Sequence, residues 1–240
     1  MAVSAERQKA RRNVVIDAAE HLIRHTRSTD FTMVEVARHA GVSPVTPYNL
    51  FETKAGLLYA LLSRSMDGIE AAGARASRVT DALDRIRVSA EAAAKFYTSD
   101  PAFYRALYRF LLGVEDPVHR PAIMERAYAY WDRATEGLKS RRLFAPEFQQ
   151  PEFAFQLMTN FLGITDLWVH GELADDEYVA RAAHGATSLL LGLVKGVERQ
   201  QLLIVLGRLR ERLSSAATLC NVGVDPKAKG AKKTAKPSLR

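Results

Sequence analysis

The sequence predicts an all-α protein. Apolar residues recur at spacings of three and four along most of the 240-residue chain, as they do on one face of an α-helix. No segment shows the apolar and polar alternation of a β-strand, and no internal repeat of 20 to 50 residues is present. A hydrophobic content of 48% is sufficient for a buried core, so the chain can form one large domain or two small ones.

The first expected helix runs from about Ala10 to His25, after residues 1–9, which are expected to form a flexible arm. Its apolar stripe consists of Val14, Val15, Ala18, Ala19, Leu22 and Ile23. A basic cluster precedes this stripe and either reaches phosphates or is simply solvated; it consists of Arg7, Lys9, Arg11 and Arg12.

The stretch from Thr32 to Lys54 organises the rest of the chain, because it predicts two short helices held at a fixed angle. Thr32 is a suitable N-cap for the first, and Gly41 can adopt the left-handed conformation of a sharp turn. Ser43 is expected to cap the second helix, with Pro44 at its first position. Two helices that meet around one glycine form the helix-turn-helix pattern of DNA-binding proteins.

This stretch resembles the TetR family of transcriptional regulators, whose motif runs T-x-x-x-I-A-x-x-A-G-V-S-x-x-T-L-Y-x-Y-F-x-x-K. The matching positions here are Thr32, Val36, Ala37, Ala40, Gly41, Val42, Ser43, Thr46, Tyr48, Phe51 and Lys54. Pro47 replaces the usual leucine and Leu50 the usual aromatic residue. With Ser43 as the cap, Pro47 is the fourth helical residue, so the helix is expected to begin with a tight turn and to point Pro47 inward.

The resemblance covers the first quarter of the chain, and together with the composition of the remainder it predicts two domains and a tail. Residues 1–54 form the N-terminal arm and a three-helix helix-turn-helix DNA-binding domain. Residues 55–221 are expected to form a helical effector-binding and dimerisation domain. Residues 222–240 consist largely of Lys, Ala, Pro and Gly with almost no apolar anchor and are expected to form a basic disordered tail.

Helix geometry and the resemblance together predict the contacts with double-stranded operator DNA. Base edges are expected to meet Pro44, Val45, Thr46 and Asn49. Phosphates are expected to meet Thr32, Ser43, Tyr48 and Lys54. Lys54 follows Thr53, a suitable cap for the next helix, whose first amides attract phosphate; a solvated surface lysine is the alternative.

Further helices are expected over 55–76, 79–98, 102–112, 122–139, 153–170, 177–195 and 198–213. The helix over 55–76 joins the two domains and either transmits motion or serves as a scaffold. The helix over 153–170 is apolar nearly all round, and small residues such as Gly185 and Ala186 allow close approach to the helix over 177–195. We therefore expect these two helices to form a four-helix homodimer interface, as the resemblance also implies.

Most of the twenty aromatic residues lie between Phe96 and Trp168. Such a density suits an apolar cavity for a small apolar or aromatic effector, although core packing is the better explanation for any single aromatic residue. The residues expected to line it are Phe103, Tyr104, Tyr108, Tyr128, Trp131, Phe155, Met158, Asn160, Phe161 and Leu162.

Charge and composition argue against several classes of protein. The formal net charge of +7 is concentrated in residues 222–240, where six basic residues accompany one acidic residue. Cys220 is the only cysteine, and neither a signal peptide nor an 18-residue uncharged apolar run is evident, so a cytoplasmic protein without membrane contact is expected. The six histidines do not cluster with other metal ligands. We expect no metal, no cofactor and no enzymatic activity.

The expected function is a DNA-binding transcriptional regulator, a repressor released from a palindromic operator by a small apolar or aromatic effector. The alternative is an all-helical small-molecule carrier or enzyme whose N-terminal helices are structural. The motif favours the regulator, because a carrier does not need one exposed surface lined by Ser43, Thr46, Tyr48 and Lys54.

Overall fold

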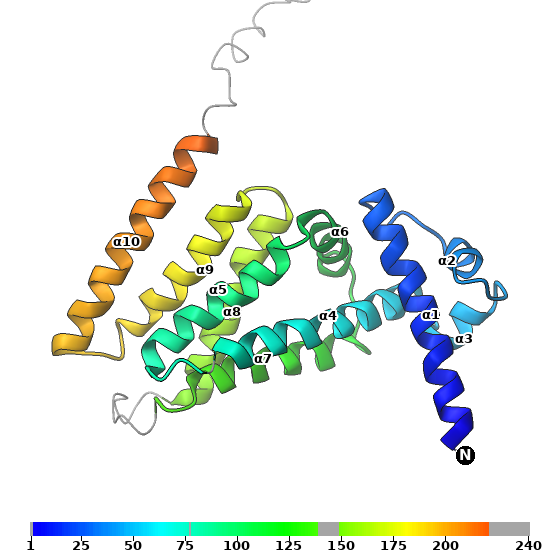
Figure 1. Ribbon diagram of the computed structural model, residues 1–240, viewed down its shortest axis with the longest axis horizontal. Helices are drawn as coiled ribbons and strands as arrows, with labels where there is room; N and C mark the ends of the chain where they lie inside the picture. Colours follow the sequence, from blue (N-terminus) through cyan, green and yellow to red (C-terminus); the bar gives the residue numbers. More distant parts are fainter. Residues whose placement is uncertain (1, 77, 139–148, 221–240) are drawn as a thin grey trace, which may run out of the picture.

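The computed structural model describes residues 2–76, 78–138 and 149–220, which form ten α-helices and no β-strand. The predicted all-α class is confirmed (Figure 1). The helices are α1 (Ala2–Thr26), α2 (Met33–His39), α3 (Thr46–Phe51), α4 (Lys54–Ala76), α5 (Ala82–Thr98), α6 (Pro101–Leu112), α7 (Arg120–Thr135), α8 (Gln150–Val169), α9 (Asp175–Leu190) and α10 (Gly196–Cys220).

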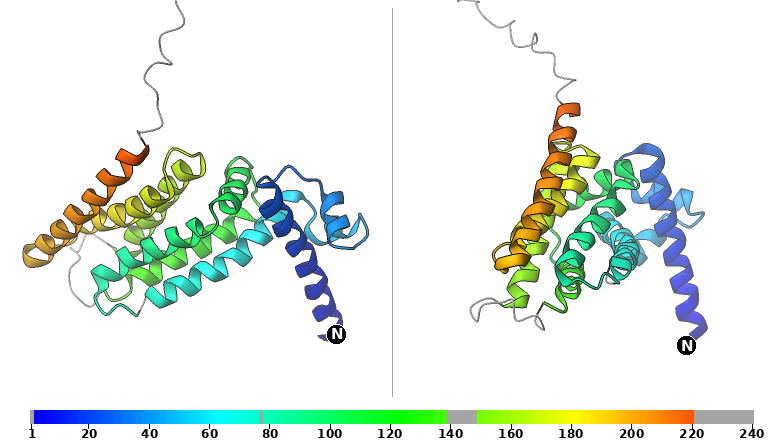
Figure 2. Two further views of the ribbon diagram at one scale, coloured as in Figure 1. Left: turned by 45° about the horizontal axis from the view of Figure 1, so that its top comes forward. Right: turned by 60° about the vertical axis from the view of Figure 1, so that its left-hand side comes forward.

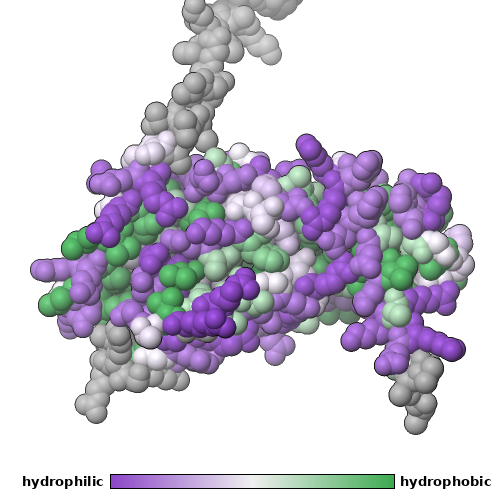
Figure 3. Space-filling view, in the orientation of Figure 1, coloured by the Kyte–Doolittle hydropathy of each residue, from purple (hydrophilic) through white to green (hydrophobic). Residues whose placement is uncertain are grey.

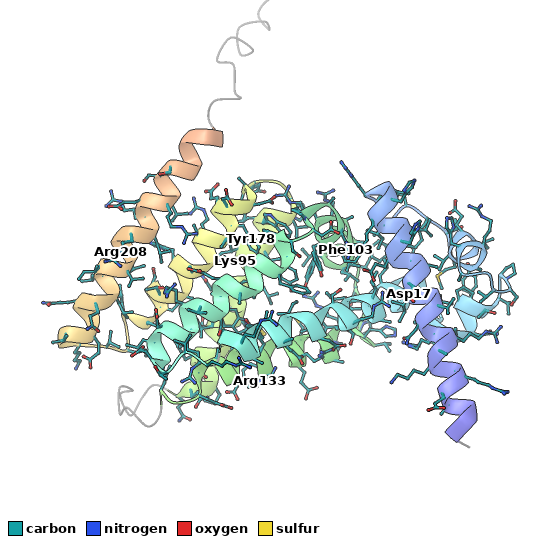
Figure 4. The ribbon with its side chains drawn as sticks, in the orientation of Figure 1. Asp17, Lys95, Phe103, Arg133, Tyr178 and Arg208 are labelled. Atoms are coloured by element: carbon teal, nitrogen blue, oxygen red, sulfur yellow. The ribbon has the colours of Figure 1, made fainter. Side chains whose placement is uncertain are left out.

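The molecule consists of a head, α1 to α3, at one end and a body, α4 to α10. Figures 1 and 2 show α4 running from the head along the body, with α10 as an outer layer against α9. Side chains such as Tyr178 and Phe103 are fully buried in the body, whereas Lys95, Arg133 and Arg208 lie at its surface (Figure 4). The expected basic tail, residues 222–240, lies outside the described residues.

The helix α1 begins earlier than expected. Residues 2–9, expected to form a flexible arm, are its first two turns and project from the head (Figure 2). Alanine, arginine, glutamate, glutamine and lysine dominate these turns, and all favour a helix even without packing. In Figure 3 the coloured part of this projection is mostly hydrophilic, and residues 5–14 are exposed. Further along, Val15, Ala19 and Ile23 are buried in the head, as the stripe predicts.

The start of α2 is as predicted. The Thr32 side chain accepts a hydrogen bond from the backbone amide of Glu35, whose carboxylate accepts one from the amide of Thr32. This reciprocal pair is a capping box. These hydrogen bonds, first that of the Thr32 backbone, hold the pKa of Glu35 below its usual value. Gly41 has a φ of 64°, which the turn after α2 requires.

The start of α3 differs from the prediction. The helix begins at Thr46 with Val45 as its N-cap residue, so Ser43 is not its cap. Pro47 therefore lies at the second helical position, where its missing N–H removes no helical hydrogen bond. The helix starts where Pro47 can be accommodated, and Pro47 is buried, as expected.

In the body, α9 is covered largely by its own chain. It ends at Leu190 rather than near residue 195, and it packs against α5, α8 and α10. Most of its small side chains, including Ala182 and Ala186, are thereby buried without a second copy. The outer helix α10 is longer than expected and is held through Leu202 and Leu209.

Salt bridges join the head to the body. Arg64 of α4 pairs with Asp17 and Glu20 of α1. Arg24 of α1 pairs with Asp100, the N-cap of α6, and its guanidinium lies 4.5 Å from the ring centre of Phe103. Because these contacts are shared among three helices, they orient the head on the body.

None of the helices in the described ranges combines the length and apolar character needed to cross a membrane. In the same residues, no cluster of three or more histidine, cysteine, aspartate or glutamate side chains could hold a metal ion.

Candidate functional site

The first candidate site is the exposed surface formed by α3 and the turn before it. Ser43, Pro44 and Asn49 are exposed, as are Val45 (60%) and Tyr48 (46%). Thr32, at the start of α2, is also exposed although its hydroxyl takes part in the capping box. The surface combines an apolar side chain, an aromatic hydroxyl and an amide, which are groups that can contact base edges and phosphates. We call these six residues the α3 surface.

Thr46 does not belong to this surface, contrary to the sequence-based expectation. Its side chain is only 5% exposed, and its Oγ1 lies 2.8 Å from the Ser43 Oγ. The same atom accepts a hydrogen bond of 3.1 Å from Arg11. The late start of α3 places Thr46 at its first position, on the side that faces α1.

Arg11 and Arg12 fix α3 on α1, a role that the sequence analysis missed. Arg12 donates a hydrogen bond of 2.7 Å to the carbonyl of Leu50, near the end of α3, and lies over the ring of Phe51. Both arginines lie three and four residues before Val15, on the face of α1 that turns toward the head core. That spacing is a signal that could have identified them.

Lys54 lies at the junction of head and body. It is half-buried, and its Nζ is 4.9 Å from the ring centre of Phe31 in the head and 5.3 Å from that of Phe110 in α6. Burial lowers its pKa. Cation–π contacts with two rings make it a link between the two parts as well as a candidate for phosphate contact.

The second candidate site is a cavity of about 100 Å³ inside the body. Five of the residues predicted to line it do so: Tyr108, Trp131, Met158, Phe161 and Leu162. The sequence analysis missed the contributions of α4, α5 and α7 almost entirely. The further lining residues are Tyr59, Leu62, Met66, Ile69, Glu70, Ala93, Tyr97, Leu111, Leu112, Arg120, Ile123, Met124, Ala127, Tyr130 and Thr165.

Five other predicted residues do not line the cavity. Phe103 packs under Arg24 and against Tyr104, which is one turn of α6 away from Tyr108. Tyr128 is half-buried on α7 outside the lining, and Phe155 is 49% exposed on the outer face of α8. Asn160 faces Gly185 of α9. In each helix only one face meets the cavity, and aromatic content alone does not identify that face.

Most hydroxyls around the cavity have partners within the protein. The Tyr97 and Tyr108 hydroxyls are 2.5 Å apart, and Tyr130 donates a hydrogen bond of 2.7 Å to the carbonyl of Ser89. The Thr165 hydroxyl lies 2.9 Å from that of Tyr178. Burial raises the pKa of Tyr97, Tyr108, Tyr130 and Tyr178, so all four hydroxyls stay protonated at neutral pH.

One side of the cavity is bordered by contacts between α4 and α7. Arg126 of α7 donates hydrogen bonds to the carboxylates of Asp67 (2.7 Å) and Glu70 (2.9 Å) and to the carbonyl of Ser63 (2.7 Å). Glu70 is itself a lining residue. These contacts hold α4 and α7 together on one side of the cavity, whereas Leu112 and Arg120, two other lining residues, are exposed to solvent.

Comparison with known proteins identifies the fold. No protein-family model and no curated protein sequence matches the chain. Solved structures do match: a TetR transcriptional regulator from Rhodococcus sp. RHA1 has a TM-score of 0.60 at 20% identity, with 78% of this chain and 100% of that chain covered. A proposed TetR-family regulator from Mesorhizobium loti MAFF303099 has a TM-score of 0.59 at 20% identity, with 78% and 98% covered.

A third structure, a TetR family regulator from Thermus thermophilus, has a TM-score of 0.51 at 18% identity, with 75% of this chain and 99% of that chain covered. At these identities the likeness shows a common fold. The chain thus has the all-helical fold of the TetR-family transcriptional regulators, with the helix-turn-helix at one end and a helical body.

Proposed function

We propose that this protein is a DNA-binding transcriptional regulator of the TetR family. The observation that carries the proposal is the α3 surface, which combines exposed residues of the expected types on a helix-turn-helix with the fold of such regulators. A carrier or enzyme with structural N-terminal helices would leave this surface without a role. Residues 1–54 are the proposed DNA-binding domain, and residues 55–221 the proposed effector-binding and dimerisation domain.

On double-stranded operator DNA, Pro44, Val45 and Asn49 face base edges. Val45 suits a thymine methyl group, and the Asn49 amide can pair with adenine. Phosphates are held by Thr32, Ser43, Tyr48 and Lys54. Thr46 is left out because it is buried and its hydroxyl is engaged with Arg11 and Ser43.

The protein acts as a homodimer on a palindromic operator. On the outer side of α8, Phe155, Gly163 and Leu167 are exposed, and on α9 Arg181 is exposed and His184 half-buried. This strip, rather than the covered small-residue face of α9, supports the twofold contact. A single α3 reads few bases, so two heads in register, about 34–36 Å apart or a multiple of that, provide the specificity.

The protein acts as a repressor released by a small apolar or aromatic effector in the body cavity. The lining is mostly apolar, and α4 connects it directly to the head. An occupant that moves α4 changes the separation of the two heads. A preference of about 1–3 kcal/mol for the non-binding spacing suffices to weaken operator affinity 5- to 150-fold.

Fluorescence anisotropy with DNA from upstream of the protein's own gene tests the proposal. Asn49→Ala should weaken binding by about 1–3 kcal/mol and relax specificity at one base pair. Gln200→Ala, which removes an exposed amide on α10 at the far end of the molecule, is the matched control and should bind like wild type. Failure of the wild type to bind any upstream fragment above its affinity for random DNA would favour the carrier or enzyme.

A further inference from the structure

One polar group of the cavity stands apart from the others. Tyr59 lines the cavity from the second turn of α4 and is only 3% exposed. Its hydroxyl is buried and has no hydrogen-bond partner among the described residues. The hydroxyls of Tyr97, Tyr108, Tyr130 and Thr165, which line the same cavity, all have partners within the protein. Because an unpaired buried hydroxyl is costly, such a group in a native protein requires an explanation.

We propose that the Tyr59 hydroxyl is the polar anchor of the effector site and bonds an oxygen atom of the ligand. The ligand class is a small, uncharged molecule with an apolar body and one hydroxyl or carbonyl group. The apolar body matches the lining by Leu62, Met66 and Phe161. Tyr130 and Thr165 already donate to the carbonyls of Ser89 and Phe161, and the Tyr97–Tyr108 pair keeps one free proton. Tyr59 is thus the lining tyrosine whose hydroxyl has no bond within the described residues. This inference rests on the proposed function, since it names the chemistry of the effector.

The volume and charge of the cavity further restrict the class of ligand that it can bind. At about 100 Å³ it is comparable to the apolar cavities of about 150 Å³ that hold one benzene ring. A buried ionised group would require a buried counter-ion. The charged lining residues do not supply one, since Arg120 is exposed to solvent and Glu70 is bonded to Arg126. An uncharged oxygen on a single ring therefore fits best.

The position of Tyr59 connects the anchor to the head. Its ring stacks on that of His119 at a centroid distance of 5.9 Å. His119 packs on Gly56 of α4, where an added Cβ would lie 3.1 Å from the His119 Cε1. The same Cβ would lie 2.3 Å from the carbonyl oxygen of Phe51, the last residue of α3. A ligand bonded to Tyr59 thus acts one turn of α4 away from the contact between body and α3.

Two probes that differ by a single hydroxyl, p-cresol and toluene, test the anchor by isothermal titration calorimetry on the full chain. Tyr59→Phe should lower the affinity for p-cresol about tenfold and leave that for toluene within twofold. Tyr130→Phe is the matched control, because it removes a hydroxyl that lines the same cavity but is bonded to the Ser89 carbonyl. It should not change the ratio of the two affinities. An unchanged p-cresol affinity in Tyr59→Phe, or no saturable p-cresol binding to wild type, would overturn the proposal.

Thermal unfolding without ligand gives a second readout. Tyr59→Phe removes an unpaired buried hydroxyl and should raise the melting temperature by roughly 2–4 °C. Tyr130→Phe leaves the Ser89 carbonyl without its donor and should lower it by a similar amount. A lower melting temperature for Tyr59→Phe would show that the hydroxyl has a structural partner, and the proposal would fail.

The proposed regulatory function is tested separately by operator binding. One outcome is that p-cresol binding depends on Tyr59 but p-cresol does not weaken the binding of upstream DNA. That outcome would support Tyr59 as the ligand anchor and refute release from DNA by an effector in this cavity. If wild type and both variants bind DNA but p-cresol affinity is insensitive to Tyr59, the anchor fails and the DNA-binding function stands.

Discussion

Replacing Gly56 by alanine tests how tightly the head is held on the body. In α4, an added Cβ at this position would lie 2.3 Å from the backbone carbonyl oxygen of Phe51 and 3.1 Å from the ring of His119. Real Cβ contacts are not that short, so the end of α3 must move away from α4. The carbonyl of Phe51 cannot rotate away freely, because it also accepts a hydrogen bond of 2.6 Å from the amide of Thr53.

The expected magnitude follows from two opposing effects. Overpacking of this kind destabilises a protein by about 1–3 kcal/mol. Alanine in place of glycine stabilises a helix by up to about 1 kcal/mol. With the full helix effect subtracted, the net destabilisation of Gly56→Ala is about 0–2 kcal/mol, or a melting temperature lower by up to roughly 8 °C. Operator affinity should also fall, because the displaced α3 presents its surface at a changed angle.

The matched control is Gly207→Ala in the middle of α10, where an added Cβ meets no atom within 4 Å. It shares the helix effect without the clash and should raise stability by up to about 1 kcal/mol. Both variants are compared by circular dichroism melts and by anisotropy with operator DNA. If Gly56→Ala is stabilised as much as Gly207→Ala and binds DNA normally, the close contact between α3, α4 and His119 does not position the head.

The outer surface of α8, the buried tyrosines and the tail each give a further prediction. Gly163→Arg on the outer side of α8, where an added Cβ meets no atom within 4 Å, should give folded monomers that fail to bind the operator. A dimer in light scattering would contradict the proposed interface, and Gly207→Arg is the control. Burial raises the pKa of Tyr97 and Tyr178, so stability should be complete below pH about 10 and fall at higher pH, where the unfolded chain ionises first. Equal stability at about pH 9 and about pH 11 in urea denaturation would refute this. Deletion of residues 223–240 should flatten the dependence of DNA affinity on salt, and an unchanged slope would show that these residues do not contact DNA.

In the head, the sequence was sufficient to predict those features of the structure that depend on local interactions. Thr32 and Gly41 act as predicted, because a cap and a left-handed turn depend on a few neighbouring residues. The predicted start of α3 was wrong. Pro44 and Pro47 are each suited to the first turn of a helix, but only one of them can occupy the first turn of α3. Packing against α1, through Arg11 and Arg12, is a tertiary effect that favours the later start.

In the body, the aromatic-rich region was found but its geometry was not. Tyr108 and Phe161 line the cavity, whereas Phe155, in the same aromatic-rich region, faces outward. Which face of a helix meets a cavity depends on how several helices cross, and a single sequence does not contain that information. Tyr59 was missed for the same reason, since the helix over 55–76 was interpreted as a link between the domains or a scaffold and not as part of the cavity.

The small volume of the cavity has a kinetic consequence. A proposed effector larger than one ring needs more room than the cavity of about 100 Å³ provides, and separation of α4 and α7 at the contacts of Arg126 with Asp67 and Glu70 would provide it. Its apparent dissociation constant equals the intrinsic constant divided by the fraction of open molecules. Its association rate then saturates at the rate of opening as its concentration rises, instead of increasing as diffusion would allow. Under the proposed release by an effector, the rate of this opening limits how fast the protein responds to a large ligand.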